Sequence, residues 1–169
     1  RADADRALAA VESRRYIDCD RFRGDLLNAR GDWAGAVKSY EAGVARAPSL
    51  PPVYLNWARA LLARKDYAGA VAKAQAAHQR GPKWADPLEV WGQALAAQGQ
   101  YPAAVAQYTA AYAYAPKWGA LQLHWGEALD RMGDRTAALD HYRQASALAL
   151  SDADRAIVSA KVAAVVAAP

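Results

Sequence analysis

The chain is poor in three residue types: its 169 residues include one cysteine, one methionine and one phenylalanine. Because Cys19 has no second cysteine to pair with, the fold cannot depend on an internal disulfide or an oxidising compartment. Neither cytoplasm nor periplasm is excluded, and the cytoplasm is our preferred expectation. No apolar run approaches the roughly 18 residues of a membrane-spanning helix, so we expect no membrane insertion.

Alanine and arginine dominate what the chain does contain. Alanine fills 45 positions, and arginine outnumbers lysine 15 to 6. Alanine has the highest helix propensity, so the composition favours helix, and the two biases together suggest a GC-rich bacterial genome. With 54% apolar residues, 22% charged residues and a formal net charge of +4, the chain can bury its own core, and disorder is excluded.

The sequence repeats itself with a period of 34 residues. The residues that keep this interval are Trp57, Trp91 and Trp125; Leu27, Leu61, Leu95 and Leu129; Ala36, Ala70, Ala104 and Ala138; and Pro48, Pro82 and Pro116. We therefore interpret 1–169 as one repeat domain. Its parts are an N-terminal helix in 1–16, repeats over 17–50, 51–84, 85–118 and 119–152, and a C-terminal capping helix in 153–169.

Each repeat is predicted to be a helical hairpin, because apolar residues follow helical spacing twice within it with a break between. Gly31, Gly99 and Gly133 fall at the breaks of three repeats, where glycine can adopt the positive φ that ends a helix. Asp86 before Pro87 has the pattern of an N-cap, which predicts a helix from about residue 87. Short loops make neighbouring helices antiparallel.

Small residues recur where the two helices of a hairpin must cross closely. We expect Gly24, Ala58, Gly92 and Gly126 on the first helices to lie against Ala36, Ala70, Ala104 and Ala138 on the second helices. At the C-terminal end, Ser151 and Asp154 form a capping-box pattern that opens a helix over about 152–166, which would cover the last repeat. A shorter helix is expected over 3–14.

With these residues the chain resembles a tetratricopeptide repeat (TPR) protein over its four repeats. The third repeat has the family's whole pattern: Trp91, Gly92, Leu95, Ala104, Tyr108, Ala111 and Pro116. The resemblance implies an all-α fold, a right-handed α-solenoid of helix-turn-helix repeats. The first repeat departs from it with Asp20 and Arg23 at apolar positions, and the second has Ala74 in place of an aromatic residue. Atypical terminal repeats are expected in a solenoid.

Candidate catalytic and metal-ligating residues are sparse. His78, His124 and His141 show no spacing typical of a zinc site, and Cys19 has no histidine near it in sequence. No phosphate-binding loop, nucleophile elbow or calcium loop occurs. We therefore expect no enzyme, no metal and no cofactor, and partly exposed histidines on helix surfaces.

The TPR resemblance implies a concave groove, lined by the first helices, that binds an extended peptide or a helix of a partner. Transferred by repeat position, the groove residues are Arg21, Asp25, Asn28, Leu55, Arg59, Leu62, Glu89, Gln93, Leu123, Glu127 and Arg131, with Asp18, Asp86, Ala96 and Asp130 at further lining positions. Carboxylates outnumber arginines among them, whereas the second helices are mainly basic. The alternative is that these are simply solvated helix faces.

Two further readings concern the rim and the ends of the groove. Trp84 and Trp118 fall between repeats, where an indole could either staple the next helix or face the groove as a rim aromatic. One TPR subgroup binds C-terminal carboxylates of chaperone tails with basic and asparagine side chains. Asp25 and Asp86 stand at positions where that subgroup needs asparagine and lysine, so we reject this partner.

The leading hypothesis is a non-enzymatic scaffold that binds a peptide or helix of a partner protein in the groove, with Leu55, Leu62 and Leu123 as exposed apolar anchors. The alternative is a structural or regulatory segment of a larger signalling or envelope protein, used for intramolecular docking or self-association. Nucleic-acid binding is not expected, because no dense stripe of basic and aromatic residues accompanies the pI of about 9.3. The sequence specifies neither the partner nor the oligomeric state.

Overall fold

A computed structural model describes residues 17–167, and every regular element in that part of the chain is an α-helix. The helices are α2 (Ile17–Ala29), α3 (Trp33–Arg46), α4 (Pro51–Ala63), α5 (Tyr67–Arg80), α6 (Ala85–Ala97), α7 (Tyr101–Tyr112), α8 (Gly119–Arg131), α9 (Arg135–Ser146) and α10 (Asp152–Ala167). The predicted all-α fold is confirmed. The helix expected over 3–14 lies outside the described residues.

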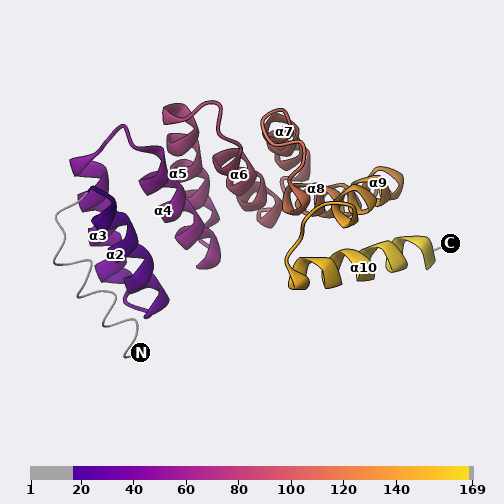
Figure 1. Cartoon of the computed structure of the whole chain (residues 1–169), viewed down its shortest axis with the longest axis horizontal. Coiled ribbons are helices and arrows are strands. Elements are labelled where there is room, and N and C mark those ends of the chain that lie inside the picture. Colours follow the sequence, from indigo (N-terminus) through magenta and orange to yellow (C-terminus); the bar gives the residue numbers. More distant parts are fainter. Residues whose placement is uncertain (1–16, 168–169) are drawn as a thin grey trace. The chain divides into compact units, whose positions relative to one another are not determined.

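Four helical hairpins follow one another along the chain, as Figure 1 shows: α2 with α3, α4 with α5, α6 with α7, and α8 with α9. We call α2, α4, α6 and α8 the first helices and α3, α5, α7 and α9 the second helices. The chain divides between Pro82 and Lys83 into two compact units. The N-terminal unit holds the first two hairpins, and the C-terminal unit holds the other two with α10.

The hairpin turns have the backbone that the sequence predicted. Gly31, Gly99 and Gly133 have φ values of 85°, 76° and 86°. In the second hairpin Lys65 adopts the same left-handed conformation, with φ of 65°, although a side chain makes this region less favourable than it is for glycine. In three hairpins the next residue, an aspartate, then caps the second helix with its side chain. The carboxylate of Asp32, for example, accepts a 2.9 Å hydrogen bond from the amide of Gly35.

The start of α6 differs from the prediction. The N-cap is Trp84, whose side chain makes no capping hydrogen bond, and the helix begins at Ala85, two residues before the expected start. Asp86 therefore lies in the first helical turn and does not cap it. Both residues remain compatible with this turn, because Pro87 needs no amide partner there and the Asp86 carboxylate interacts favourably with the helix dipole.

Close approach within the hairpins involves mainly tyrosine rings, and at Gly126 also the expected Ala138, whose carbonyl oxygen would lie 3.2 Å from a Cβ atom. A Cβ atom at Gly24 would lie 2.5 Å from Cε1 of Tyr40, and one at Gly126 would lie 2.7 Å from Cε1 of Tyr142. The tyrosine ring is closer to the glycine than the alanine methyl group is. The ring is therefore the reason why this position requires glycine. The second hairpin has alanine on both sides, at Ala58 and Ala74, and both are fully buried.

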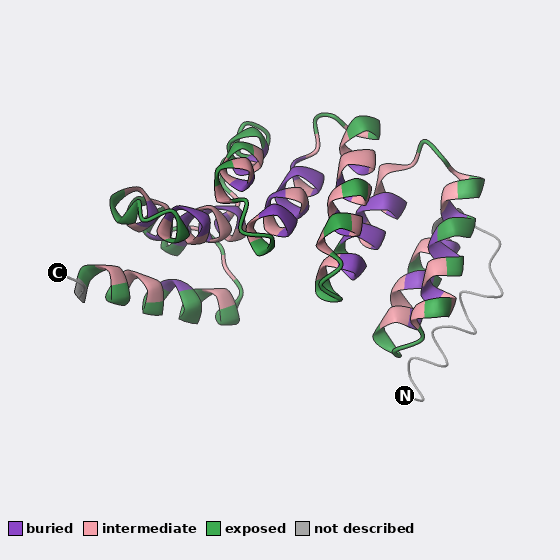
Figure 2. Ribbon diagram, turned by 180° about the vertical axis from the view of Figure 1, so that it is seen from behind, coloured by how far each residue is buried: buried purple, intermediate pink, exposed green. Residues whose placement is uncertain are grey.

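The C-terminal helix α10 covers the last hairpin, as predicted. Val158 is 1% exposed and belongs to a buried cluster with Leu123 of α8 and Tyr142 of α9. The capping box is also present: the amide of Asp154 donates to Ser151 Oγ, and Ser151 Oγ donates to the Asp154 carboxylate. In Figure 2 the buried residues lie where paired helices face each other. Among the described side chains of α10, Val158 is the buried one.

Candidate binding surface on the first helices

Contacts between neighbouring first helices follow a fixed interval. Asn56 Nδ2 of α4 donates a 2.6 Å hydrogen bond to Asp25 of α2, and Gln93 Nε2 of α6 lies 3.3 Å from His124 Nδ1 of α8. Lys161 Nζ of α10 lies 3.7 Å from the Asp130 carboxylate of α8. The two residues of each pair are 31 positions apart in the sequence. This interval is the 34-residue repeat length shortened by about one helical turn. Within each unit, these contacts lie on one side of the first helices. We call this side the first-helix face of the unit.

In the N-terminal unit, Asp25 is the centre of a hydrogen-bond network. Its carboxylate accepts bonds from the Tyr40 hydroxyl at 2.7 Å and from Asn56 at 2.6 Å. Burial raises the pKa of Tyr40, and the hydrogen bond and the charge of Asp25 raise it further. Asp25, predicted as a groove residue, is thus held by two neighbours on two different helices.

The leucines predicted as exposed anchors are placed differently. Leu55 is 1% exposed and Leu123 is 2% exposed, so the expectation of exposure is wrong for both. Leu123 is buried because α10 covers it, through the cluster that contains Val158. Leu55 stands at the same position of its repeat as Leu123. Leu62 is half-buried and Arg59 is exposed, as an accessible surface requires.

In the C-terminal unit, a buried carboxylate pairs with a histidine. Glu89 of α6 is 3% exposed, and its Oε1 lies 2.7 Å from His124 Nδ1 and accepts a further hydrogen bond from Gln93 Nε2. Burial by itself lowers the pKa of His124, but the hydrogen bond that His124 donates to Glu89 and the charges of Glu89, Glu127 and Asp154 outweigh it, so the pKa is raised. The pair is therefore a charge-assisted bond between two first helices.

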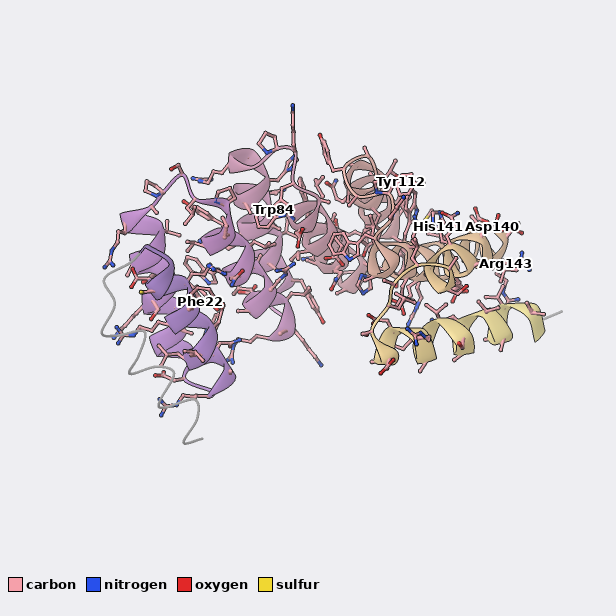
Figure 3. All side chains as sticks on the ribbon, in the orientation of Figure 1. Phe22, Trp84, Tyr112, Asp140, His141 and Arg143 are labelled. Atoms are coloured by element: carbon pink, nitrogen blue, oxygen red, sulfur yellow. The ribbon has the colours of Figure 1, made fainter. Side chains whose placement is uncertain are left out.

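The other predicted site residues occupy varied environments. Arg21 stacks over the ring of Phe22, 4.0 Å from its centroid, and Phe22 is exposed (Figure 3). Asn28 and Glu127 are half-buried, and Arg131 is exposed. Trp84 and Trp118 are the N-cap residues of α6 and α8 and are half-buried, a position that fits both stapling and a rim.

Three of the second helices, α3, α5 and α9, carry lysines and arginines, and most of these are exposed. Several already have partners: Arg46 lies 3.2 Å from Asp20, Arg80 donates to the Pro48 carbonyl, and Arg143 lies 3.9 Å from Asp140 on α9 (Figure 3). Lys73 Nζ lies 3.6 Å from the ring centroid of Trp57. Much of the positive charge on these helices is therefore engaged locally.

A hollow of about 220 Å³ lies between α2 and α3. It is lined by Asp20, Arg23, Leu27, Asp32, Gly35, Lys38, Ser39 and Ala42. None of the predicted groove residues contributes to it. It instead contains the two charged residues, Asp20 and Arg23, at which the first repeat departs from the apolar pattern.

Sequence reasoning did not predict the inter-helix contacts of three residues on the first-helix face: Asn56, His124 and Lys161. It treated His124 as a surface histidine because no partner lies near it in sequence. The 31-residue interval is the signal that could have found all three, since it relates each to a polar residue of the preceding first helix. The 34-residue period identifies residues at equivalent positions of two repeats. Such residues do not face each other.

The part of the chain that the structure describes contains no group of three or more His, Cys, Asp or Glu side chains able to hold a metal ion. Within the same residues, no helix is both long and apolar enough to cross a membrane.

No family model matches the chain, and no curated protein matches it in sequence. Among solved structures, a MamA fragment from Desulfovibrio magneticus superposes with a TM-score of 0.74 at 19% identity, over 86% of this chain and 85% of that chain. TTC0263, a thermophilic TPR protein of Thermus thermophilus, gives 0.73 at 20% identity, over 89% of this chain and 81% of that chain. A chain of the APC/C hetero-tetramer Cut9–Hcn1 gives 0.81 at 14% identity, over 97% of this chain and 33% of that chain.

These similarities show the fold. The protein is a helical-repeat protein of the TPR type, an α-solenoid class, as its sequence resemblance implied.

Proposed function

We propose that the chain is a non-enzymatic protein-interaction module that binds a segment of a partner protein on its first-helix faces. The observation that carries this proposal is the way those faces are built. Buried or half-buried polar groups such as Asp25 and Glu89 are held by neighbours on adjacent helices. Side chains beside them, such as Arg59, remain exposed. Fixed polar groups next to accessible ones suit recognition of a peptide.

The surroundings of the histidines support binding over catalysis. His124 pairs with a buried carboxylate between two helices, and His141 stacks on Trp125 with ring centroids 4.1 Å apart. Each imidazole is thus used to join helices. A general base needs a histidine directed at a reacting group beside a nucleophile, and neither residue has such a neighbour in the described part of the chain.

One observation favours the alternative, docking within a larger protein or self-association. Ile157 and Val166 of α10 are 43% and 64% exposed. Apolar side chains on a terminal helix provide a surface on which another segment or another copy could pack. This second candidate function uses α10 and leaves the first-helix faces free.

The proposal is tested by selecting peptides from a displayed random library against the immobilised 169-residue chain and measuring their affinity by fluorescence anisotropy. A variant with Arg59→Glu and Leu62→Ser changes the first-helix face of the N-terminal unit, and Glu127→Lys changes that of the C-terminal unit. The matched control, Lys38→Glu with Arg135→Glu, changes exposed residues of second helices in both units.

We expect at least one first-helix variant to weaken binding about tenfold while the control binds as the parent chain does, a difference of about 1.4 kcal/mol. Circular dichroism should show the same helical content in all variants. Selected peptides that bind every first-helix variant normally, or selections that yield no peptide, would contradict the proposal. Loss of binding in a variant with exposed α10 residues changed, Ile157→Ser with Val166→Ser, would support the alternative.

A further inference from the structure

The first-helix face of the C-terminal unit carries an excess of negative charge. Glu127 and Asp130 lie on α8, and Asp154 lies on α10 close enough to act with Glu127 on His124. Lys161 pairs with Asp130. No hydrogen bond or ion pair within residues 17–167 engages the half-buried carboxylate of Glu127. We call Glu127, Asp130 and Asp154 the acidic face.

A buried hydroxyl without a partner lies beside the acidic face. Tyr142 of α9 is fully buried, and its hydroxyl has no hydrogen-bond partner in the described structure. Its ring covers Gly126, the residue that precedes Glu127 on α8. Burial raises the pKa of Tyr142, the charges of Asp130 and Glu127 raise it further, and the charge of Arg131 lowers it.

The first repeat shows what a tyrosine at this position does when it has a partner. Tyr40 and Asp25 stand exactly three repeats before Tyr142 and Glu127. The Tyr40 hydroxyl donates to Asp25, which also accepts a bond from Asn56 of the next first helix. At the corresponding place in the last repeat, the Tyr142 hydroxyl has no hydrogen-bond partner among the described residues. A buried, unsatisfied hydroxyl costs about 1–3 kcal/mol, so a group that reaches it gains from satisfying it.

The chain itself shows which chemistry this surface accepts. The Lys161 ammonium lies 3.7 Å from Asp130, although Asp130 and Lys161 are only about 30% exposed. A second lysine or arginine could meet Glu127 in the same way. Its N–H groups would donate to the carboxylate and to the Tyr142 oxygen, which accepts hydrogen bonds as well as donating them. An anionic group would instead be repelled by the carboxylates of Glu127 and Asp154, which form no ion pair among the described residues.

We propose that the acidic face of the C-terminal unit binds a lysine or arginine side chain of the partner segment, with Glu127 as its main contact and Tyr142 as a second. This inference rests on the proposed function, because it names the chemistry of a partner that the first-helix face would bind. The inference predicts that the partner segment has a lysine or arginine in the part that contacts α8 and α10.

The test uses the whole chain and three labelled peptides of equal length: a glycine–serine peptide with three lysines, the same peptide with three glutamates, and the glycine–serine peptide alone. We expect only the lysine peptide to bind in about 50 mM salt and to weaken as salt rises to about 500 mM. Glu127→Gln should weaken it about fivefold or more, about 1 kcal/mol. Tyr142→Phe should weaken it less, with no loss of stability.

The matched control is Asp140→Asn, which removes one exposed carboxylate from α9 of the same unit and should change the affinity less than twofold. Equal binding of lysine and glutamate peptides, or equal loss in Glu127→Gln and Asp140→Asn, overturns the inference. The library peptides separate the two proposals. If they bind first-helix faces but contain no basic residue and bind Glu127→Gln normally, the inference fails and the proposed function stands. If neither they nor the lysine peptide bind, both fail.

Discussion

The hydroxyl of Tyr40 donates a 2.7 Å hydrogen bond to the carboxylate of Asp25, and this bond has no counterpart at Tyr142. The two tyrosines fill the same position of the repeat and are both fully buried. They differ in one respect that should affect the free energy of unfolding. The Tyr40 hydroxyl forms a hydrogen bond within the described structure, and the Tyr142 hydroxyl does not.

Tyr40→Phe should lower the free energy of unfolding by about 1–2 kcal/mol, because it removes a hydrogen bond to a charged group. Tyr142→Phe should leave it unchanged or raise it, because it removes only an unsatisfied buried hydroxyl. Urea titrations followed by circular dichroism measure both, and each variant serves as the control for the other. Equal destabilisation by the two substitutions would show that Tyr142 has a partner in the folded chain.

The pH dependence of stability should have opposite signs at the two histidines of the C-terminal unit. The pKa of His124 is raised above its ordinary 6.5, so the folded chain binds its proton more tightly. Its contribution is fully present below pH 6.5 and is lost as the pH rises through the folded pKa. Burial lowers the pKa of His141, with a smaller opposing effect of Asp140, so its contribution is lost as the pH falls below 6.5.

Unfolding free energies of the parent chain, His124→Gln and His141→Gln, measured across this range, check these signs. The difference between the parent and His124→Gln should shrink above pH 6.5. The difference between the parent and His141→Gln should shrink below pH 6.5. The two variants control for each other, since both remove an imidazole from the same unit. Parallel pH dependences in both would contradict the assignment.

Gly92→Ala should lower the free energy of unfolding by about 1–3 kcal/mol through overpacking. A Cβ atom at this position would lie 2.8 Å from Cδ1 of Tyr108, which is itself buried. In a Tyr108→Ala background the same substitution should become neutral or stabilising, because the ring is gone and alanine favours helix over glycine by about 1 kcal/mol. A thermal-denaturation double-mutant cycle gives the coupling; additive effects would mean that the ring and the glycine do not compete for space.

Much of the fold is predictable because it depends on local chemistry that repeats. The left-handed turns at Gly31, Gly99 and Gly133 and the capping box at Ser151 and Asp154 were predicted from residue type and spacing, and the structure confirms them. Each depends on residues a few positions apart. The start of α6 was misplaced because a polar residue before a proline was given more weight than the extended backbone at Trp84.

The binding surface is less predictable because it depends on neighbouring repeats. Leu55 and Leu123 were expected to be exposed since Trp57 and Leu61 seemed to complete the core of a single hairpin. Burial of Leu123 comes instead from α10, which begins more than twenty residues later in the chain. The pairing of Glu89 with His124 escaped prediction for the same reason: it joins two first helices. The position of a residue within its repeat predicts the helix face on which it lies. It does not predict whether a later helix covers that residue.

Leu55→Ser and Leu62→Ser should therefore have different consequences, although the two leucines lie on one helix. Leu55 is 1% exposed, so serine should cost about 2–5 kcal/mol in unfolding free energy, as large-to-small core substitutions do. Leu62 is half-buried, and its substitution should cost about 1 kcal/mol or less. Denaturant titration of the two variants is the measurement. A small loss of unfolding free energy in Leu55→Ser would show that the Leu55 side chain is accessible to a partner.

Binding to DNA should be weak despite the pI of about 9.3. Non-specific affinity grows with the number of phosphates that free lysines and arginines neutralise together. Here Arg46 pairs with Asp20, Arg80 donates to the Pro48 carbonyl, and Lys73 lies over Trp57. Several cations of the described residues are thus engaged locally, and the acidic face of the C-terminal unit repels a polyanion. Titration of labelled duplex DNA should give no binding tighter than about 1 μM at about 150 mM salt. Submicromolar affinity at that salt concentration would overturn this distribution of charge, and with it the preference for a protein partner.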